Sequence, residues 1–194
     1  MNQKDKIIEV TIQLINENGG DISKVTARKI AERAQVGLGL INYHFGSKDT
    51  LITECVQKII SNVIGCFQPQ NIEYSSDPIE ADKERLTYWA SQVFEFLYAN
   101  KSVSAISILG DMKNNLRESN TLNTQIGFEG AIKSDISEAR KNLILFMLVS
   151  SMQEAFLQDN LVLLRLGLDM QKKEDRGKYV KSVVDLLFGG IRNE

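Results

Sequence analysis

The sequence has few of the residues that interrupt helices or build catalytic and metal sites. Its 194 residues include 2 prolines, 1 histidine and 2 cysteines. A single histidine excludes any metal site or catalytic triad that needs two imidazoles. Cys55 and Cys66 are too few for a disulfide scaffold and lack the CxxC spacing, which favours a reducing compartment. We therefore expect a protein that is not an enzyme and that has no cofactor and no metal.

Charge and hydropathy exclude two further classes. The 23 basic and 25 acidic residues give a net charge of −2, which excludes a protein that coats nucleic acid through bulk charge. The longest apolar run, 143–149, is far shorter than the roughly 20 residues of a membrane-spanning helix. The N-terminus is polar and lacks the apolar segment of a signal peptide. These features predict a soluble, cytoplasmic protein without membrane contact.

Apolar residues recur at helical spacing along most of the sequence. Both prolines, Pro69 and Pro78, fall within one polar stretch, which predicts a linker over 68–79. No sustained period-2 alternation is found, so the sequence predicts an all-α fold. The expected helices of the longer C-terminal part cover 102–116, 121–137, 138–159, 161–168 and 176–190.

Residues 26–45 have the layout of a helix-turn-helix. Thr26 can cap a first helix, whose buried face carries Ile30, Ala31 and Ala34. The link 35–37 leads to a second helix over 38–45, and Ser47 can cap the helix that follows. Such a motif places its second helix in the major groove of DNA. Spacing alone leaves open the alternative that these are unrelated short helices that follow one another by chance.

The residues themselves are more specific. The segments T-A-R-K-I-A-E-R-A, L-I-N-Y-H-F and G-S-K-D-T-L, between Thr26 and Leu51, closely resemble the DNA-binding signature of the TetR family of transcriptional regulators. The resemblance implies a three-helix helix-turn-helix DNA-binding domain over 1–48 and a connecting helix over 49–67. After the linker, it implies a helical effector-binding and dimerisation domain over 80–194. Two positions depart from the family pattern: Gln35 replaces a usual glycine, and Gly37 replaces a usual Ser or Thr cap.

The resemblance also implies which residues contact DNA. Arg28 can pair with guanine, Asn42 can pair with adenine, and leucine side chains can contact only thymine methyl groups. Hydroxyl, imidazole and ammonium groups can donate to phosphates, which position the protein. Alternatively, Tyr43 and His44 pack over the domain surface, and Leu38 and Leu40 belong to the core. The expected DNA-binding residues are Thr26, Ala27, Arg28, Gly37, Leu38, Gly39, Leu40, Asn42, Tyr43, His44 and Lys48.

The charge is divided unevenly along the chain. Residues 1–48 hold seven Lys or Arg and five Asp or Glu, a net charge of +2, and the remainder carries −4. One copy would therefore attract DNA weakly, which favours a homodimer on a palindromic operator. The apolar segment 143–149 and a C-terminal stripe suit the dimer interface that the resemblance implies, although both could be monomer core. The expected interface residues are Phe146, Val149, Val180, Val183, Val184 and Leu187.

Aromatic and methionine side chains of the C-terminal part could line an effector pocket, although such residues usually form core. The resemblance favours a pocket for an unknown small molecule, and the composition favours an apolar or aromatic one. The expected pocket residues are Trp89, Phe94, Met112, Phe128 and Met147. The resemblance thus implies a DNA-binding repressor that a small-molecule effector releases from its operator. The alternative is a helical protein-interaction module without specific DNA binding.

Overall fold

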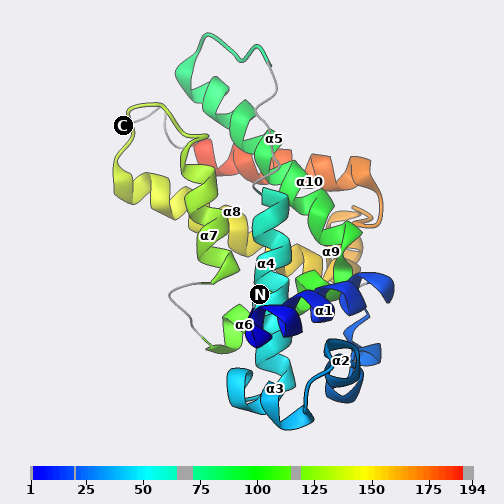
Figure 1. Ribbon diagram of the computed structural model, residues 1–194. Helices are drawn as coiled ribbons and strands as arrows, with labels where there is room; N and C mark the ends of the chain where they lie inside the picture. The colour runs from blue at the N-terminus through cyan, green and yellow to red at the C-terminus, as the bar shows by residue number, and fades with distance from the viewer. Residues whose placement is uncertain (1, 20, 65–71, 115–118, 190–194) are drawn as a thin grey trace. The chain divides into compact units, whose positions relative to one another are not determined.

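A computed structural model describes residues 2–19, 21–64, 72–114 and 119–189 (Figure 1). Within these ranges the chain is helical and contains no strand, which confirms the all-α prediction. None of the described helices is long and apolar enough to cross a membrane. The helices are α1 (Gln3–Glu17), the 3-10 helix η1 (Ile22–Lys24), α2 (Ala27–Ala34), α3 (Leu38–Phe45), α4 (Lys48–Ile64), α5 (Pro78–Ala99), α6 (Lys101–Asn114), α7 (Asn120–Glu129), α8 (Glu138–Leu157), α9 (Asp159–Leu166) and α10 (Lys173–Phe188).

The chain forms two compact units. The first comprises Met1–Pro69 and Asn100–Asn115, and the second comprises Gln70–Ala99 and Leu116–Glu194. Helix α6 belongs to the first unit because it packs against α4. The compact units therefore divide the chain differently from the expected boundaries at residues 48, 67 and 79, which stay a prediction about functional domains.

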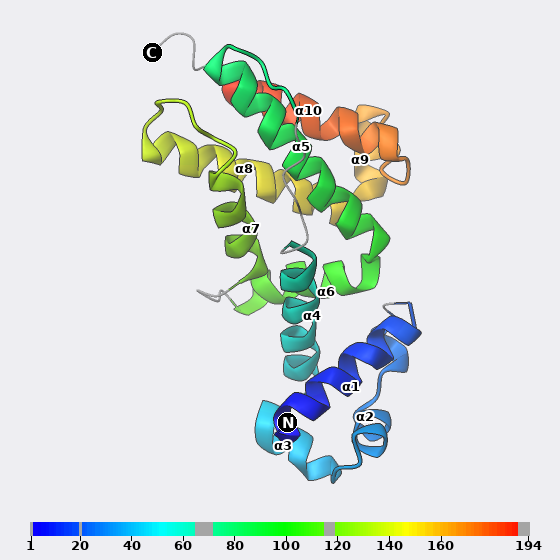
Figure 2. The same ribbon diagram turned by 45° about the horizontal axis from the view of Figure 1, so that its top comes forward.

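The first unit is built around α4. Helix α1 packs on α2 and α4, and α3 packs on α2 and α4, as Figure 2 shows for the blue and cyan helices. Side chains from each of these helices are fully buried, so the helices share one apolar core. The fully buried side chains include Ile7, Ile15, Ile30, Ile41, Leu51 and Ile52.

The second unit consists of α5, α7, α8, α9 and α10. Helix α5 lies along α10, and α8 packs against α7, α9 and α10 (Figures 1 and 2). The Arg176 guanidinium of α10 is buried, and it donates to the Glu95 carboxylate of α5 at 2.8 and 2.6 Å and to the Met170 carbonyl at 2.8 Å. These bonds satisfy the buried charge and hold the segment before α10 against α5.

Several element boundaries differ from the sequence prediction, and two of the differences have a clear physical cause. Helix α5 begins at Pro78, inside the expected linker, because the first helical position needs no N–H donor and the Asp77 carboxylate accepts from Ile79 and Glu80. Helix α7 ends at Glu129, although a helix was expected over 121–137. The buried Asp82 carboxylate accepts two backbone N–H groups of the segment after α7, each at 2.9 Å, which holds this segment in a non-helical conformation.

Candidate DNA-binding site

Helix α2 is fixed at both ends by local hydrogen bonds. At its start, Thr26 is extended and its Oγ1 accepts from the Lys29 backbone N–H at 3.3 Å, as a capping residue does. At its end, Gln35 is left-handed, with φ 56°, and the Val36 N–H donates to the Ala31 carbonyl at 2.9 Å. This bond closes the turn towards α3. The first helix of the predicted motif and its cap are therefore present.

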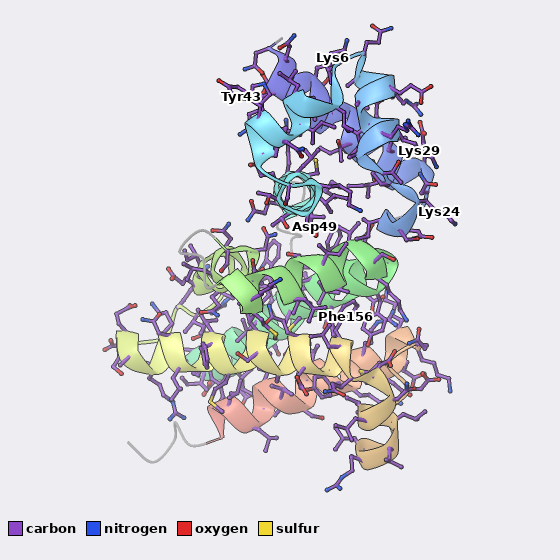
Figure 3. All side chains as sticks on the ribbon, turned by 90° about the horizontal axis from the view of Figure 1, so that it is seen from below. Lys6, Lys24, Lys29, Tyr43, Asp49 and Phe156 are labelled. Atoms are coloured by element: carbon purple, nitrogen blue, oxygen red, sulfur yellow. The ribbon has the colours of Figure 1, made fainter. Side chains whose placement is uncertain are left out.

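Helix α3 separates an apolar face from an exposed one. Ile41 and Phe45 are buried against the rest of the first unit. On the opposite side Asn42 and Gly39 are exposed, Leu38 is 52% exposed, and Tyr43 is 81% exposed. Figure 3 shows Tyr43 extending outward from this unit. An exposed face of this composition on the second helix of a helix-turn-helix is suited to contact DNA bases and phosphates.

The N-terminus of α3 is held by a backbone hydrogen bond rather than by a side-chain cap. Gly37 is extended with φ −67° and gives no side-chain cap, but its carbonyl accepts from the Leu40 N–H at 2.9 Å. The departure from a Ser or Thr cap therefore leaves the helix start intact. Leu40 is half-buried, in contrast to the exposed Leu38. Among the two leucines, Leu38 thus presents more of its side chain to solvent.

Lys48 lies beside the start of α2. Ser47 caps α4, with its Oγ accepting from the Thr50 N–H at 3.1 Å. The Lys48 ammonium group donates to the Val25 carbonyl at 3.4 Å, one residue before Thr26. Lys48 and the Thr26 cap are thereby brought to one edge of the motif, although they are 22 positions apart in sequence.

The basic residues near the motif differ in how they are engaged. Arg33 forms a two-bond ion pair with Glu17 at 2.7 and 2.6 Å, and the Lys24 ammonium lies 3.2 Å from the Asp21 carboxylate. The Lys29 ammonium turns back to the Lys24 carbonyl at 3.2 Å. The Arg28 guanidinium is exposed and makes no hydrogen bond within the described residues. Arg28 is therefore the available cation of the first turn of α2.

His44 is held among aromatic rings. It is half-buried, and its ring packs edge-on against Tyr43 at 5.1 Å and Phe45 at 6.1 Å between centroids. Ala27 is also half-buried, at the start of α2. Among the described residues, no group of three or more His, Cys, Asp or Glu is placed to hold a metal ion.

Comparison with known proteins agrees with this geometry. Residues 7–55 match the family model of bacterial regulatory proteins of the tetR family. The fold is similar to the crystal structure of a TetR transcriptional regulator from Rhodococcus sp. RHA1, with a TM-score of 0.60 and 16% sequence identity over 99% of this chain and 96% of that chain. Residues 7–55 are therefore a DNA-binding domain of the tetR type, and the whole chain shares the fold of this solved regulator. A search of curated proteins found no significant match.

The second unit does not gather the five expected pocket residues. Phe94 and Phe128 are buried, and Trp89 is half-buried. The Phe94 ring packs against Tyr98 at 5.4 Å and Tyr179 at 6.0 Å between centroids, which is a core environment. Two of the expected residues are exposed instead: Met112, on α6 of the first unit, and Met147, on α8.

The expected interface residues differ in their burial. Val149, Val180 and Val184 are buried within their own unit, as the monomer-core alternative holds. Phe146 is 58% exposed, and Val183 and Leu187 are half-buried. Three further side chains of α8 and α10 are exposed but were not among the expected interface residues: Leu143, Met147 and Leu186. Leu143, Phe146 and Met147 lie at helical spacing in the apolar segment 143–149, so they share the exposed face that this segment was expected to offer a partner.

Proposed function

We propose that this chain is a TetR-family regulator, namely a sequence-specific repressor that binds a palindromic operator as a homodimer and is released by a small-molecule effector bound in its C-terminal part. The observation that carries the proposal is the exposed face of α3. Tyr43 is 81% exposed on a short helix whose other face is fully packed. An aromatic side chain in this position has no role in the core and is available for a partner.

The chemistry of the exposed residues favours a particular operator. Leu38 offers only methyl groups, which suit the C5-methyl group of thymine. Arg28 suits guanine and Asn42 suits adenine. Thr26, Tyr43, His44 and Lys48 provide donors for phosphates, and Ala27, Gly37, Gly39 and Leu40 provide close backbone or apolar contact. We therefore expect few guanine contacts and several thymine-methyl contacts in each half-site.

Charge favours two copies on one operator. Residues 1–48 carry a net charge of only +2, and Lys24 and Arg33 already pair with carboxylates of the same unit. A single copy therefore gains little from phosphate attraction. A two-fold dimer places two recognition helices about 34 Å apart, one turn of DNA, or somewhat more, so that both bind one palindrome. Exposed apolar residues of α8 and α10 provide the surface for this dimer.

The effector is proposed to bind in the second unit. This unit carries the aromatic residues Trp89, Phe94 and Phe128, which favour an apolar or aromatic molecule. Release requires that the effector bind the free dimer more tightly than the operator-bound dimer. Equal effector affinity for the two forms would contradict this part of the proposal.

Selection of genomic DNA fragments by the purified protein tests DNA recognition. We expect enrichment of a palindrome, and a loss of binding at some positions when thymine is replaced by uracil. Asn42→Ala should lower affinity for the selected site more than for random DNA, and Tyr43→Phe should weaken binding to both. Gln13→Ala, on the exposed face of α1, is the control that should leave both unchanged. The absence of any enriched sequence would favour the alternative, a helical protein-interaction module.

A further inference from the structure

One face of α8 is apolar near its N-terminus and is not covered by any described element. Leu143, Phe146 and Met147 are each about half exposed there, and Leu186 of α10, 80% exposed, extends the surface. A groove on this face is lined by Arg140, Leu143, Ile144, Met147, Leu186 and Leu187. Soluble proteins rarely leave a contiguous apolar surface of this kind without a partner.

The same face of α8 carries an incompletely bonded cation and an unpaired anion, separated by four helical turns. Arg140 donates from one terminal nitrogen to the Leu187 carbonyl at 3.3 Å, while its Nε is shielded from solvent and has no acceptor among the described residues. Glu154 is exposed, and its carboxylate forms no hydrogen bond or ion pair within the described part of the chain. By contrast, Lys141 on this helix is already paired with Glu138 at 2.8 Å.

The spacing of these charges is symmetric about one residue. Arg140, Met147 and Glu154 are seven positions apart, so they lie close to one line along the helix surface. Each charge is about 10 Å from Met147 along the helix axis, since the rise is about 1.5 Å per residue. A second α8 helix, turned by a two-fold rotation about an axis through Met147, therefore places its anion beside this cation and its cation beside this anion.

We propose that the groove on α8 holds the α8 helix of a second copy, packed antiparallel about a two-fold axis at Met147, with Arg140 of each copy paired to the partner's Glu154. The inference rests on the proposed function, which requires a homodimer, and it specifies the register and the pairing residues of that dimer. The contact is isologous, so one pair of residues forms two ion pairs.

Side-chain size agrees with this register. The partner's Ser151 faces Leu143, so a small side chain meets a large one and the two helices can approach closely. The Ser151 hydroxyl donates to the Leu148 carbonyl at 2.8 Å, so its burial would leave no unsatisfied polar group. Phe146 and Met147 meet their own copies at the centre of the interface.

Charge reversal tests the register. Arg140→Glu alone, or Glu154→Arg alone, places like charges at both ends of the interface, and each should raise the dimer dissociation constant at least about tenfold. A 1:1 mixture of the two variants should restore a heterodimer, because both pairs are then of opposite charge. Sedimentation velocity over a dilution series measures these equilibria. Lys173→Glu, an exposed reversal at the start of α10, is the control and should leave the dimer unchanged.

A disulfide at the axis gives an independent readout. Met147→Cys should cross-link to its own copy under mild oxidation, whereas Asn142→Cys, which faces a different partner residue, should not; wild-type protein oxidised in parallel controls for the native thiols. Circular dichroism verifies that each variant is folded. If wild-type protein is dimeric but the reversals do not weaken it and Met147→Cys does not cross-link, the register is overturned and the homodimer stands. A wild-type chain that is monomeric at every concentration would overturn the proposed homodimer as well.

Discussion

Nothing in the fold of the first unit requires a glycine at position 39. It is the second residue of α3, it is exposed, and its φ is not positive. A Cβ added at this position would meet no atom of the chain within 4 Å. Glycine within a helix costs about 0.5–1 kcal/mol relative to alanine, because it loses more backbone freedom on folding. Gly39→Ala should therefore raise the free energy of unfolding by about this amount.

The same substitution should weaken DNA binding. Gly39 lies on the exposed face of α3 with Leu38, Asn42 and Tyr43, where the proposed function brings the helix backbone close to the bases. An added methyl group in a close-packed contact costs about 1–3 kcal/mol, which is roughly a 5- to 150-fold rise in Kd for each half-site. A variant that is more stable and binds less tightly separates a role in recognition from a role in folding.

Urea unfolding followed by circular dichroism measures the first effect, and fluorescence anisotropy with a selected operator at fixed salt measures the second. Gly127→Ala in α7 is the matched control: the site is exposed, a Cβ meets no atom within 4 Å, and the gain in stability should come without a change in DNA affinity. Unchanged operator affinity in Gly39→Ala would refute the close approach, and a loss of stability would refute the helical assignment of this position.

Three further predictions concern the fold. Gln35→Gly should stabilise the protein by about 0.5–1 kcal/mol in urea unfolding, since a left-handed non-glycine residue is strained, whereas Glu32→Gly within α2 should destabilise it. Burial alone raises the pKa of Asp82, but hydrogen bonds from Ser134, Lys133 and Arg85 outweigh it and hold the pKa below the usual value for an aspartate. Its stabilisation is thus present above pH 3.8 and is lost as the pH falls below that value; Asp82→Asn should be less stable at pH 7 and should show a shallower loss of stability in acid. Burial raises the pKa of the Cys55 thiol to about 12, so in a Cys66→Ser chain a thiol reagent should react only on unfolding; rapid labelling of the folded protein would contradict this.

The helix-turn-helix could be predicted from sequence because its signals are local. Thr26 and Ser47 cap the helices that follow them through bonds spanning three residues, and Ile41 and Phe45 are four positions apart on one buried face. Gln35 and Gly37 depart from the family pattern, yet the left-handed turn and the helix start both form. Short-range spacing and capping therefore determined this part of the structure.

The second unit was harder to predict because long-range contacts decide it. Helix α7 ends early because Asp82, about 50 positions away, binds the backbone at Lys133 and Ser134. Periodicity marked Val149 and Val180 as apolar without distinguishing a partner-facing residue from one buried in its own unit. The proposed pocket and interface stay predictions, and Cys66 lies outside the described residues.

The assignment of α6 to the first compact unit has a consequence for exchanging parts between regulators. The chain passes from one unit to the other three times, after residues 69, 99 and 115, so the DNA-binding unit is not one continuous piece of the gene. A hybrid that joins residues 1–67 to a foreign C-terminal part would leave α4 without the helix that packs against it. A working chimera of this protein should therefore transplant residues 100–115 together with the N-terminal segment.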